Sequence, residues 1–176
     1  MKKYIPNILT TYRLIFSFFI PVLFLTKNYY LLAILFIIAL LSDAFDGYFA
    51  RKWGVVSNYG KIVDVLSDKA LALLSSTTLI FEVSKLFIIT LVLELVISII
   101  NSISYIKSKS VDNHSSSIYG KVKTWFLFIT LLIGVLTLKY NLDILLEVFI
   151  VTTAIMQLVT AYNYYKENKK LKSSLS

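Results

Sequence analysis

The chain has 176 residues, of which 57% are apolar and only 16% are charged, and its formal net charge is +8. Soluble proteins average about 45–50% apolar and about 25% charged residues, so this composition excludes an ordinary soluble domain and predicts a membrane protein. The chain has no cysteine, which excludes disulfide bonds and thiolate metal or redox sites. In so apolar a chain, the basic surplus indicates loops that face an anionic membrane surface, and no nucleic-acid partner is expected.

Six long apolar segments bounded by charged residues predict six helices joined by short connections. In chain order they span residues 8–25, 29–48, 61–81, 85–106, 121–138 and 142–162. Each is close to the length of about 20 residues that crosses a bilayer as a helix. We therefore expect an all-α, polytopic membrane protein with six transmembrane helices in one bundle, and residues 1–176 as a single membrane domain.

The basic residues are unevenly divided between the two sides of this predicted bundle. One side holds only Lys27, Lys85 and Lys139. The side of the two termini holds Lys2, Lys3, Arg51, Lys52, Lys61, Lys107, Lys109, Lys121, Lys123, Lys166, Lys169, Lys170 and Lys172. Because basic loops are retained in the cytoplasm, this asymmetry predicts that both termini are cytoplasmic.

Four of the ten acidic residues fall within one 26-residue window at the predicted cytoplasmic ends of the second and third helices. Asp43 and Asp46 are three residues apart, and Asp64 and Asp68 are four apart, so each pair shares one face of its helix. The two helices are consecutive and antiparallel, so the four carboxylates can converge. Their mutual repulsion calls for a cation, and hard oxygen ligands favour magnesium, manganese or calcium over zinc.

Small residues accompany these aspartates. Gly47, Ala50, Gly54 and Gly60 leave the backbone accessible to a phosphorylated ligand. Arg51 offers a forked set of donors for a diphosphate or a lipid phosphate.

This window resembles the full signature of the CDP-alcohol phosphatidyltransferases. It reads Asp43-x-x-Asp46-Gly47-x-x-Ala50-Arg51 and, after eight residues, Gly60-x-x-x-Asp64-x-x-x-Asp68. The resemblance implies transfer of a phosphatidyl group from CDP-diacylglycerol to an alcohol with release of CMP. It also implies Mg²⁺ or Mn²⁺ as cofactor and a homodimer in the bacterial plasma membrane, with sites that open to the cytoplasm.

The resemblance further implies a role for each residue of the motif. Asp43, Asp46 and Asp64 would bind the divalent metal, and Asp68 would be the catalytic base and share the second metal. Gly47, Ala50 and Gly60 would contact the cytidine nucleotide.

Other segments resemble the phosphatidylglycerophosphate synthases of this family, whose acceptor is sn-glycerol 3-phosphate. They are Pro6-Asn7-Ile8-Leu9-Thr10-x-x-Arg13, Asp68-Lys69 and Gly120-Lys121-Val122-Lys123-Thr124. Arg13, Lys121 and Lys123 are the candidates for holding the acceptor phosphate. Leu93 and Asn101 stand where such synthases usually carry arginine, and phosphatidylglycerol, giving cardiolipin, or another polyol remains the alternative acceptor.

Two readings outside this chemistry stay open. Carboxylates in a membrane can form the ion path of a cation-coupled transporter. Here, however, the acids gather at one end, and the remaining spans carry mainly Glu94, Asp143 and Glu147. The other reading is a catalytically silent paralogue that acts as a partner, which the complete motif opposes.

Overall fold

The computed structural model describes residues 5–55, 58–108 and 118–173, and these residues form six helices. They are α1 (Ile5–Leu25), α2 (Tyr29–Lys52), α3 (Asn58–Glu82), α4 (Phe87–Ser108), α5 (Ile118–Thr137) and α6 (Asp143–Ser173). The prediction of six helices is confirmed. The largest differences are at the ends of α2 and α6, which continue beyond the predicted limits 48 and 162, because backbone hydrogen bonding does not stop where the apolar residues do.

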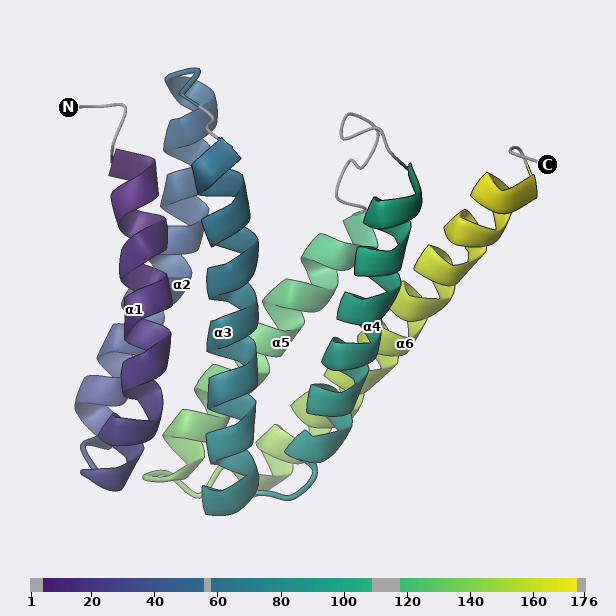
Figure 1. Ribbon diagram of the computed structural model, residues 1–176. Coiled ribbons are helices and arrows are strands. Elements are labelled where there is room, and N and C mark those ends of the chain that lie inside the picture. Colours follow the sequence, from purple (N-terminus) through teal and green to yellow (C-terminus); the bar gives the residue numbers. More distant parts are fainter. Residues whose placement is uncertain (1–4, 56–57, 109–117, 174–176) are drawn as a thin grey trace.

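The helices run alternately up and down (Figure 1). The starts of α1, α3 and α5 and the ends of α2, α4 and α6 lie at one end of the bundle, which we call the upper end. Helix α1 packs against α2 and α3, while α6 packs against α4 and α5. These two groups of three helices meet where α3 contacts α4 and α5, and where α2 contacts α5.

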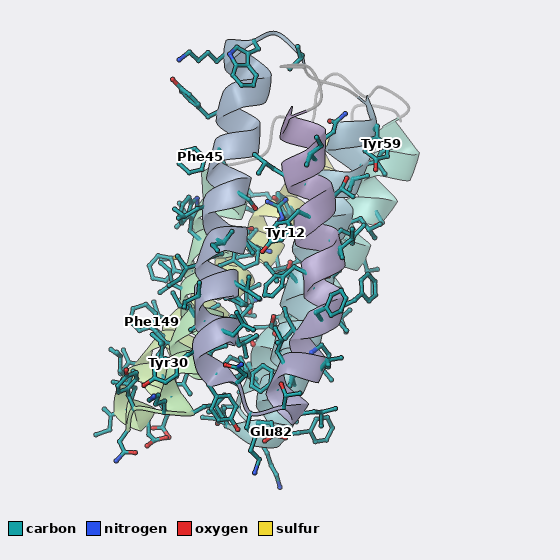
Figure 2. The ribbon with its side chains drawn as sticks, turned by 90° about the vertical axis from the view of Figure 1, so that its left-hand side faces the viewer. Tyr12, Tyr30, Phe45, Tyr59, Glu82 and Phe149 are labelled. Atoms are coloured by element: carbon teal, nitrogen blue, oxygen red, sulfur yellow. The ribbon has the colours of Figure 1, made fainter. Side chains whose placement is uncertain are left out.

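A continuous apolar core joins the two groups. Its fully buried members include Phe36 of α2, Leu71 and Leu79 of α3, Phe87 of α4 and Leu131 of α5. Many other large apolar side chains face outward, as the side view with side chains shows (Figure 2). Apolar residues both inside and outside are typical of a helix bundle surrounded by lipid.

One glycine fixes how closely α5 approaches its neighbours. A Cβ atom built at Gly134 would lie 2.8 Å from Cζ of Phe87 and 2.9 Å from Cδ1 of Leu79. Only glycine therefore fits at this crossing of α5 with α3 and α4 without displacing a side chain.

Among the residues whose side chains the structure describes, three segments are long and apolar enough to cross a membrane, namely Asn7–Leu25, Gly120–Thr137 and Asp143–Lys166. The described side chains of α2 and α4 add the apolar segments Tyr29–Ser42 and Phe87–Ser102. These segments support a membrane bundle. Six complete spans and the cytoplasmic termini stay predictions.

Many hydroxyl groups bond to a carbonyl of their own helix. In α3, Oγ1 of Thr77 donates to the carbonyl of Leu73 at 2.8 Å, and Oγ1 of Thr78 donates to Leu74 at 2.8 Å. Between helices, the hydroxyls of Thr130 in α5 and Thr153 in α6 are 2.6 Å apart and both side chains are buried. These bonds satisfy polar groups that face an apolar surrounding.

Candidate active site

The upper end of α2 carries half of the acidic motif. Ser42 of this helix is buried, and the motif residues follow directly in the same helix. The side chains of Asp43, Asp46, Gly47, Ala50 and Arg51 lie outside the described part of the structure. Their backbone is helical, and their metal-binding and nucleotide-binding roles stay predictions.

The upper half of α3 carries the other acidic pair. Asp64 and Asp68 lie one helical turn apart, and their side chains are 43% and 30% exposed. Helical spacing therefore places both carboxylates on one face, as the sequence predicts. Gly60 lies one turn before Asp64 in the same helix and is partly exposed.

Arg13 of α1 joins this pair from below the surface. Its side chain is fully buried, and its Nη2 lies 2.5 Å from Oδ1 of Asp64 and 3.1 Å from Oδ1 of Asp68. Its Nε donates to Oγ of Ser67 at 3.1 Å, and that hydroxyl donates to the backbone carbonyl of Asp64 at 2.9 Å. One guanidinium thus bridges two carboxylates and ties α1 to α3.

A second polar cluster lies between α4, α5 and α6. Nζ of Lys123 donates to both oxygens of Glu94, at 2.7 and 2.6 Å, and both side chains are buried or nearly so. Nε2 of Gln157 donates to Oε2 of Glu94 and to the backbone carbonyl of Thr90, each at 3.1 Å. Lys123 is therefore held by an internal carboxylate in this structure.

Lys69 connects the two clusters. It follows Asp68 in α3, and its Nζ donates to Oγ of Ser98 in α4. It is also close enough to Asp68, Glu94 and Lys123 to interact with them electrostatically. Acidic and basic groups therefore alternate from Arg13 across α3 to Lys123.

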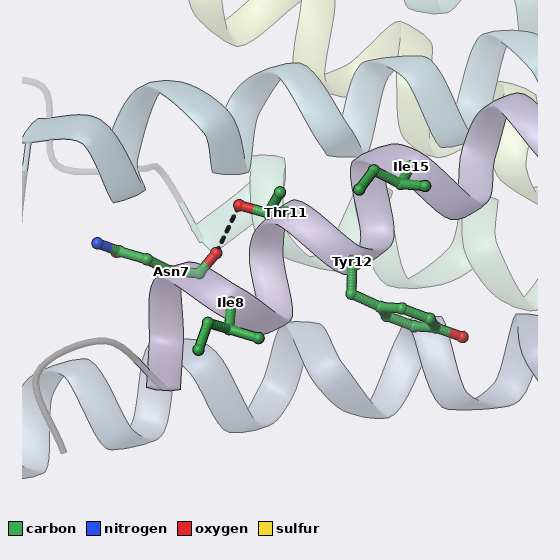
Figure 3. A pocket seen from close by; sticks show the side chains of 5 residues that line it. All are labelled: Asn7, Ile8, Thr11, Tyr12 and Ile15. Carbon is green, nitrogen blue, oxygen red and sulfur yellow. Dashed lines mark hydrogen bonds between the residues drawn. The ribbon is translucent and has the colours of Figure 1, made fainter. Parts of the chain in front are cut away.

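An apolar groove of about 380 Å³ lies beside the first turns of α1 (Figure 3). It is lined by Asn7, Ile8, Thr11, Tyr12 and Ile15, and Oγ1 of Thr11 donates to the backbone carbonyl of Asn7 at 2.7 Å. The groove is open and almost wholly apolar, and it flanks the helical segment that presents Arg13 to the carboxylates.

The donor chemistry of Asp64 and Asp68 fits a divalent cation. Each carboxylate is partly exposed while its guanidinium partner is buried, so part of each carboxylate is accessible from outside. Oxygen donors of this kind suit Mg²⁺ or Mn²⁺. Among the described side chains, no group of three or more potential metal ligands comes together, and Asp43 and Asp46 are not among those side chains.

The three candidates for the acceptor phosphate lie in different surroundings. Lys121 is exposed at the upper end of α5, whereas Arg13 and Lys123 are buried in ion pairs. Sequence reasoning did not find these pairs, nor the hydrogen bond from Gln157 to Glu94. The available signal was that a charged or amide side chain within an apolar helix needs a polar partner.

Comparisons with known proteins identify the family. The sequence profile of the CDP-alcohol phosphatidyltransferases matches residues 3–162. A protein of Rickettsia felis named CDP-diacylglycerol--glycerol-3-phosphate 3-phosphatidyltransferase is 32% identical over 182 aligned positions, which cover 97% of this chain and 98% of that protein. A protein of the same name from Aquifex aeolicus is 33% identical and covers 95% of this chain and 97% of its own length. The chain therefore belongs to the CDP-alcohol phosphatidyltransferase family and is a phosphatidyltransferase.

Proposed function

We propose that this enzyme transfers the phosphatidyl group of CDP-diacylglycerol to sn-glycerol 3-phosphate, releasing CMP and forming phosphatidylglycerophosphate. The observation that carries this proposal is the match, over nearly the whole chain, to relatives that bear the name of that reaction. The paired carboxylates Asp64 and Asp68 at the upper end of α3 support the same chemistry.

In this proposal the metal ligands are Asp43, Asp46, Asp64 and Asp68. When bound, Mg²⁺ or Mn²⁺ stabilises the negative charge of the diphosphate as CMP leaves. The oxygen donors and partial exposure of Asp64 and Asp68 support this assignment.

Asp68 is the proposed catalytic base. The acceptor hydroxyl gives its proton to the Asp68 carboxylate as its oxygen attacks the phosphorus that carries the diacylglycerol. The bond from this phosphorus to the oxygen of CMP then breaks, and CMP leaves with the electron pair. The partial exposure of Asp68 supports access of a hydroxyl group.

The remaining predicted contacts are with the two substrates, the CDP-linked lipid and the acceptor. Gly47, Ala50, Arg51 and Gly60 are proposed to hold the nucleotide and its phosphates. Lys121 is exposed and therefore suits the acceptor phosphate without rearrangement.

Arg13 and Lys123 would reach an acceptor phosphate only after leaving their carboxylate partners. Their contacts with the acceptor stay a prediction.

The proposal includes a membrane setting. We place the upper end, with both termini, in the cytoplasm of a bacterial plasma membrane, with six spans below it and a homodimer as the assembly. The apolar groove beside Tyr12 supports a lipid donor, since it offers apolar surface at the end that carries the carboxylates.

Release of CMP by the purified protein tests the proposal. With Mg²⁺ and CDP-diacylglycerol, CMP should appear on addition of sn-glycerol 3-phosphate and not without an alcohol. Release with phosphatidylglycerol or a polyol instead would assign the alternative acceptor. Absence of release with every alcohol would contradict the function.

The catalytic assignment has its own pair of variants. Asp68→Asn should lower the rate by about 10²–10⁴-fold, because the proton acceptor is lost. Asp143→Asn is the matched control, since Asp143 is an exposed acid at the opposite end of the bundle. Equal activity of Asp68→Asn and Asp143→Asn would remove Asp68 from the mechanism.

A further inference from the structure

Arg13 is in an unusual position for a basic residue beside a metal site. Its side chain is fully buried, although a charged group without compensation is strongly disfavoured in an apolar interior. Its Nη2 lies within 3.1 Å of two carboxylates at once, and those carboxylates are the partly exposed Asp64 and Asp68. The guanidinium therefore approaches the acidic pair from the buried side and leaves the outer side accessible.

The hydrogen bonds fix the direction of this guanidinium. Nε donates to Ser67, whose hydroxyl is itself bonded to the carbonyl of Asp64 in the same turn of α3. A planar guanidinium held at Nε has little freedom to rotate, so Nη2 stays directed at the carboxylates. These contacts within the chain fix the separation and orientation of Asp64 and Asp68.

We propose that Arg13 is a positioning residue and a built-in counterion: it holds Asp64 and Asp68 in place before a divalent cation binds, and its charge weakens the binding of that cation. The inference rests on the metal site of the proposed function. The positive charge of Arg13, in contact with the proposed metal ligands Asp64 and Asp68, repels a divalent ion. Because the guanidinium is buried, the surroundings screen this repulsion less than water would. Weak binding of this kind allows the ion to exchange, while the ligands keep their geometry when it is absent.

Direct Mn²⁺ binding to the full-length protein in detergent tests this role, with free Mn²⁺ measured by electron paramagnetic resonance. Arg13→Gln should bind Mn²⁺ about tenfold more tightly or more, since the repelling charge is gone. Arg13→Lys keeps the charge and should stay within about threefold of the wild type. Ser67→Ala removes only the neutral partner of Nε and should also keep the wild-type affinity to within about threefold.

Thermal unfolding gives a second measurement. Arg13→Gln should melt below the wild type without Mn²⁺, because Asp64 and Asp68 then lose the guanidinium that offsets their mutual repulsion. Saturating Mn²⁺ should close most of that gap, because the ion replaces the missing charge. A residue that merely packs α1 against α3 would lose the same stability with and without Mn²⁺.

Several results would overturn the proposal. Unchanged or weaker Mn²⁺ binding by Arg13→Gln would do so, and so would an Arg13→Lys protein that binds as tightly as Arg13→Gln. A variant Arg13→Gln that fails to fold even with Mn²⁺ would show that a cation cannot replace the guanidinium. CMP release by the wild type is measured separately, so an inactive wild type with the expected Mn²⁺ shift would defeat the proposed function alone.

Discussion

Removal of either partner of the ion pair between Glu94 in α4 and Lys123 in α5 should strongly destabilise the protein. Their side chains are only 12% and 7% exposed, and Nζ of Lys123 lies within 2.7 Å of both carboxylate oxygens. Removal of one partner leaves the other charge buried, which typically costs about 3–5 kcal/mol. Removal of both charges together costs far less, so the two substitutions should be strongly non-additive.

The surroundings of the pair also predict which single substitution is worse. Lys123→Met leaves Glu94 with the amide of Gln157 at 3.1 Å and with the nearby charge of Lys69. Glu94→Gln instead leaves the ammonium groups of Lys69 and Lys123 without the carboxylate that lies near both, and among the described groups only Asp68 remains to compensate the charge of Lys69. We expect about 3 kcal/mol for Lys123→Met and about 4–5 kcal/mol for Glu94→Gln. The double variant should lose only about 1–2 kcal/mol.

Equilibrium unfolding in mixed micelles, followed by circular dichroism, measures the four free energies. Lys121→Gln serves as the control, because this lysine is exposed in the same helix and should change stability by no more than about 0.5 kcal/mol. A double variant whose loss equals the sum of the single losses would refute the reasoning. So would single losses of less than about 1 kcal/mol, which would show that the pair is effectively solvated.

Three further predictions follow from other contacts. Gly134→Ala should destabilise the bundle by about 1–2 kcal/mol in the same unfolding assay. The added Cβ would lie 2.8 Å from Cζ of Phe87, and this overpacking outweighs a gain in helix propensity of about 1 kcal/mol. A more stable variant would contradict this. Thr130→Val should cost about 0.5–1.5 kcal/mol, since it removes the 2.6 Å bond to the buried hydroxyl of Thr153, and an unchanged free energy of unfolding would count against that bond. Lys121→Gln should raise KM for sn-glycerol 3-phosphate about tenfold in a steady-state assay, with kcat nearly unchanged. A fall in kcat alone would exclude Lys121 from binding the acceptor phosphate.

The sequence was sufficient to predict the helices because each apolar segment approaches the length of a membrane span. It was less informative about where they end. Helix α2 continues to Lys52 and α6 to Ser173, because polar and charged residues sustain helical hydrogen bonds as well as apolar ones do. The face shared by Asp64 and Asp68 was predictable, since a spacing of four residues fixes it locally.

The partners of the buried charges were not predictable in the same way. Arg13 and Asp64 are 51 residues apart, and Lys123 and Glu94 are 29 apart. Which side chains meet over such separations depends on the rotation of each helix about its axis, which apolar periodicity leaves poorly determined when most faces are apolar. The sequence marked Arg13 as a charge within an apolar helix but did not identify its carboxylate partners.

Hydroxyls that bond to a carbonyl of their own helix lower the free energy needed to transfer that helix into hydrocarbon. In α3, the threonines at 77 and 78 each donate to a carbonyl four residues earlier, so neither carries an unpaired donor. Hydropathy scales count these residues by composition and therefore overestimate the free energy of moving such a helix into hydrocarbon. The solvation cost of α3 is consequently smaller than its residue content indicates, and the groups that cost most to move into hydrocarbon are its charged ones, among them Asp64, Asp68 and Lys69.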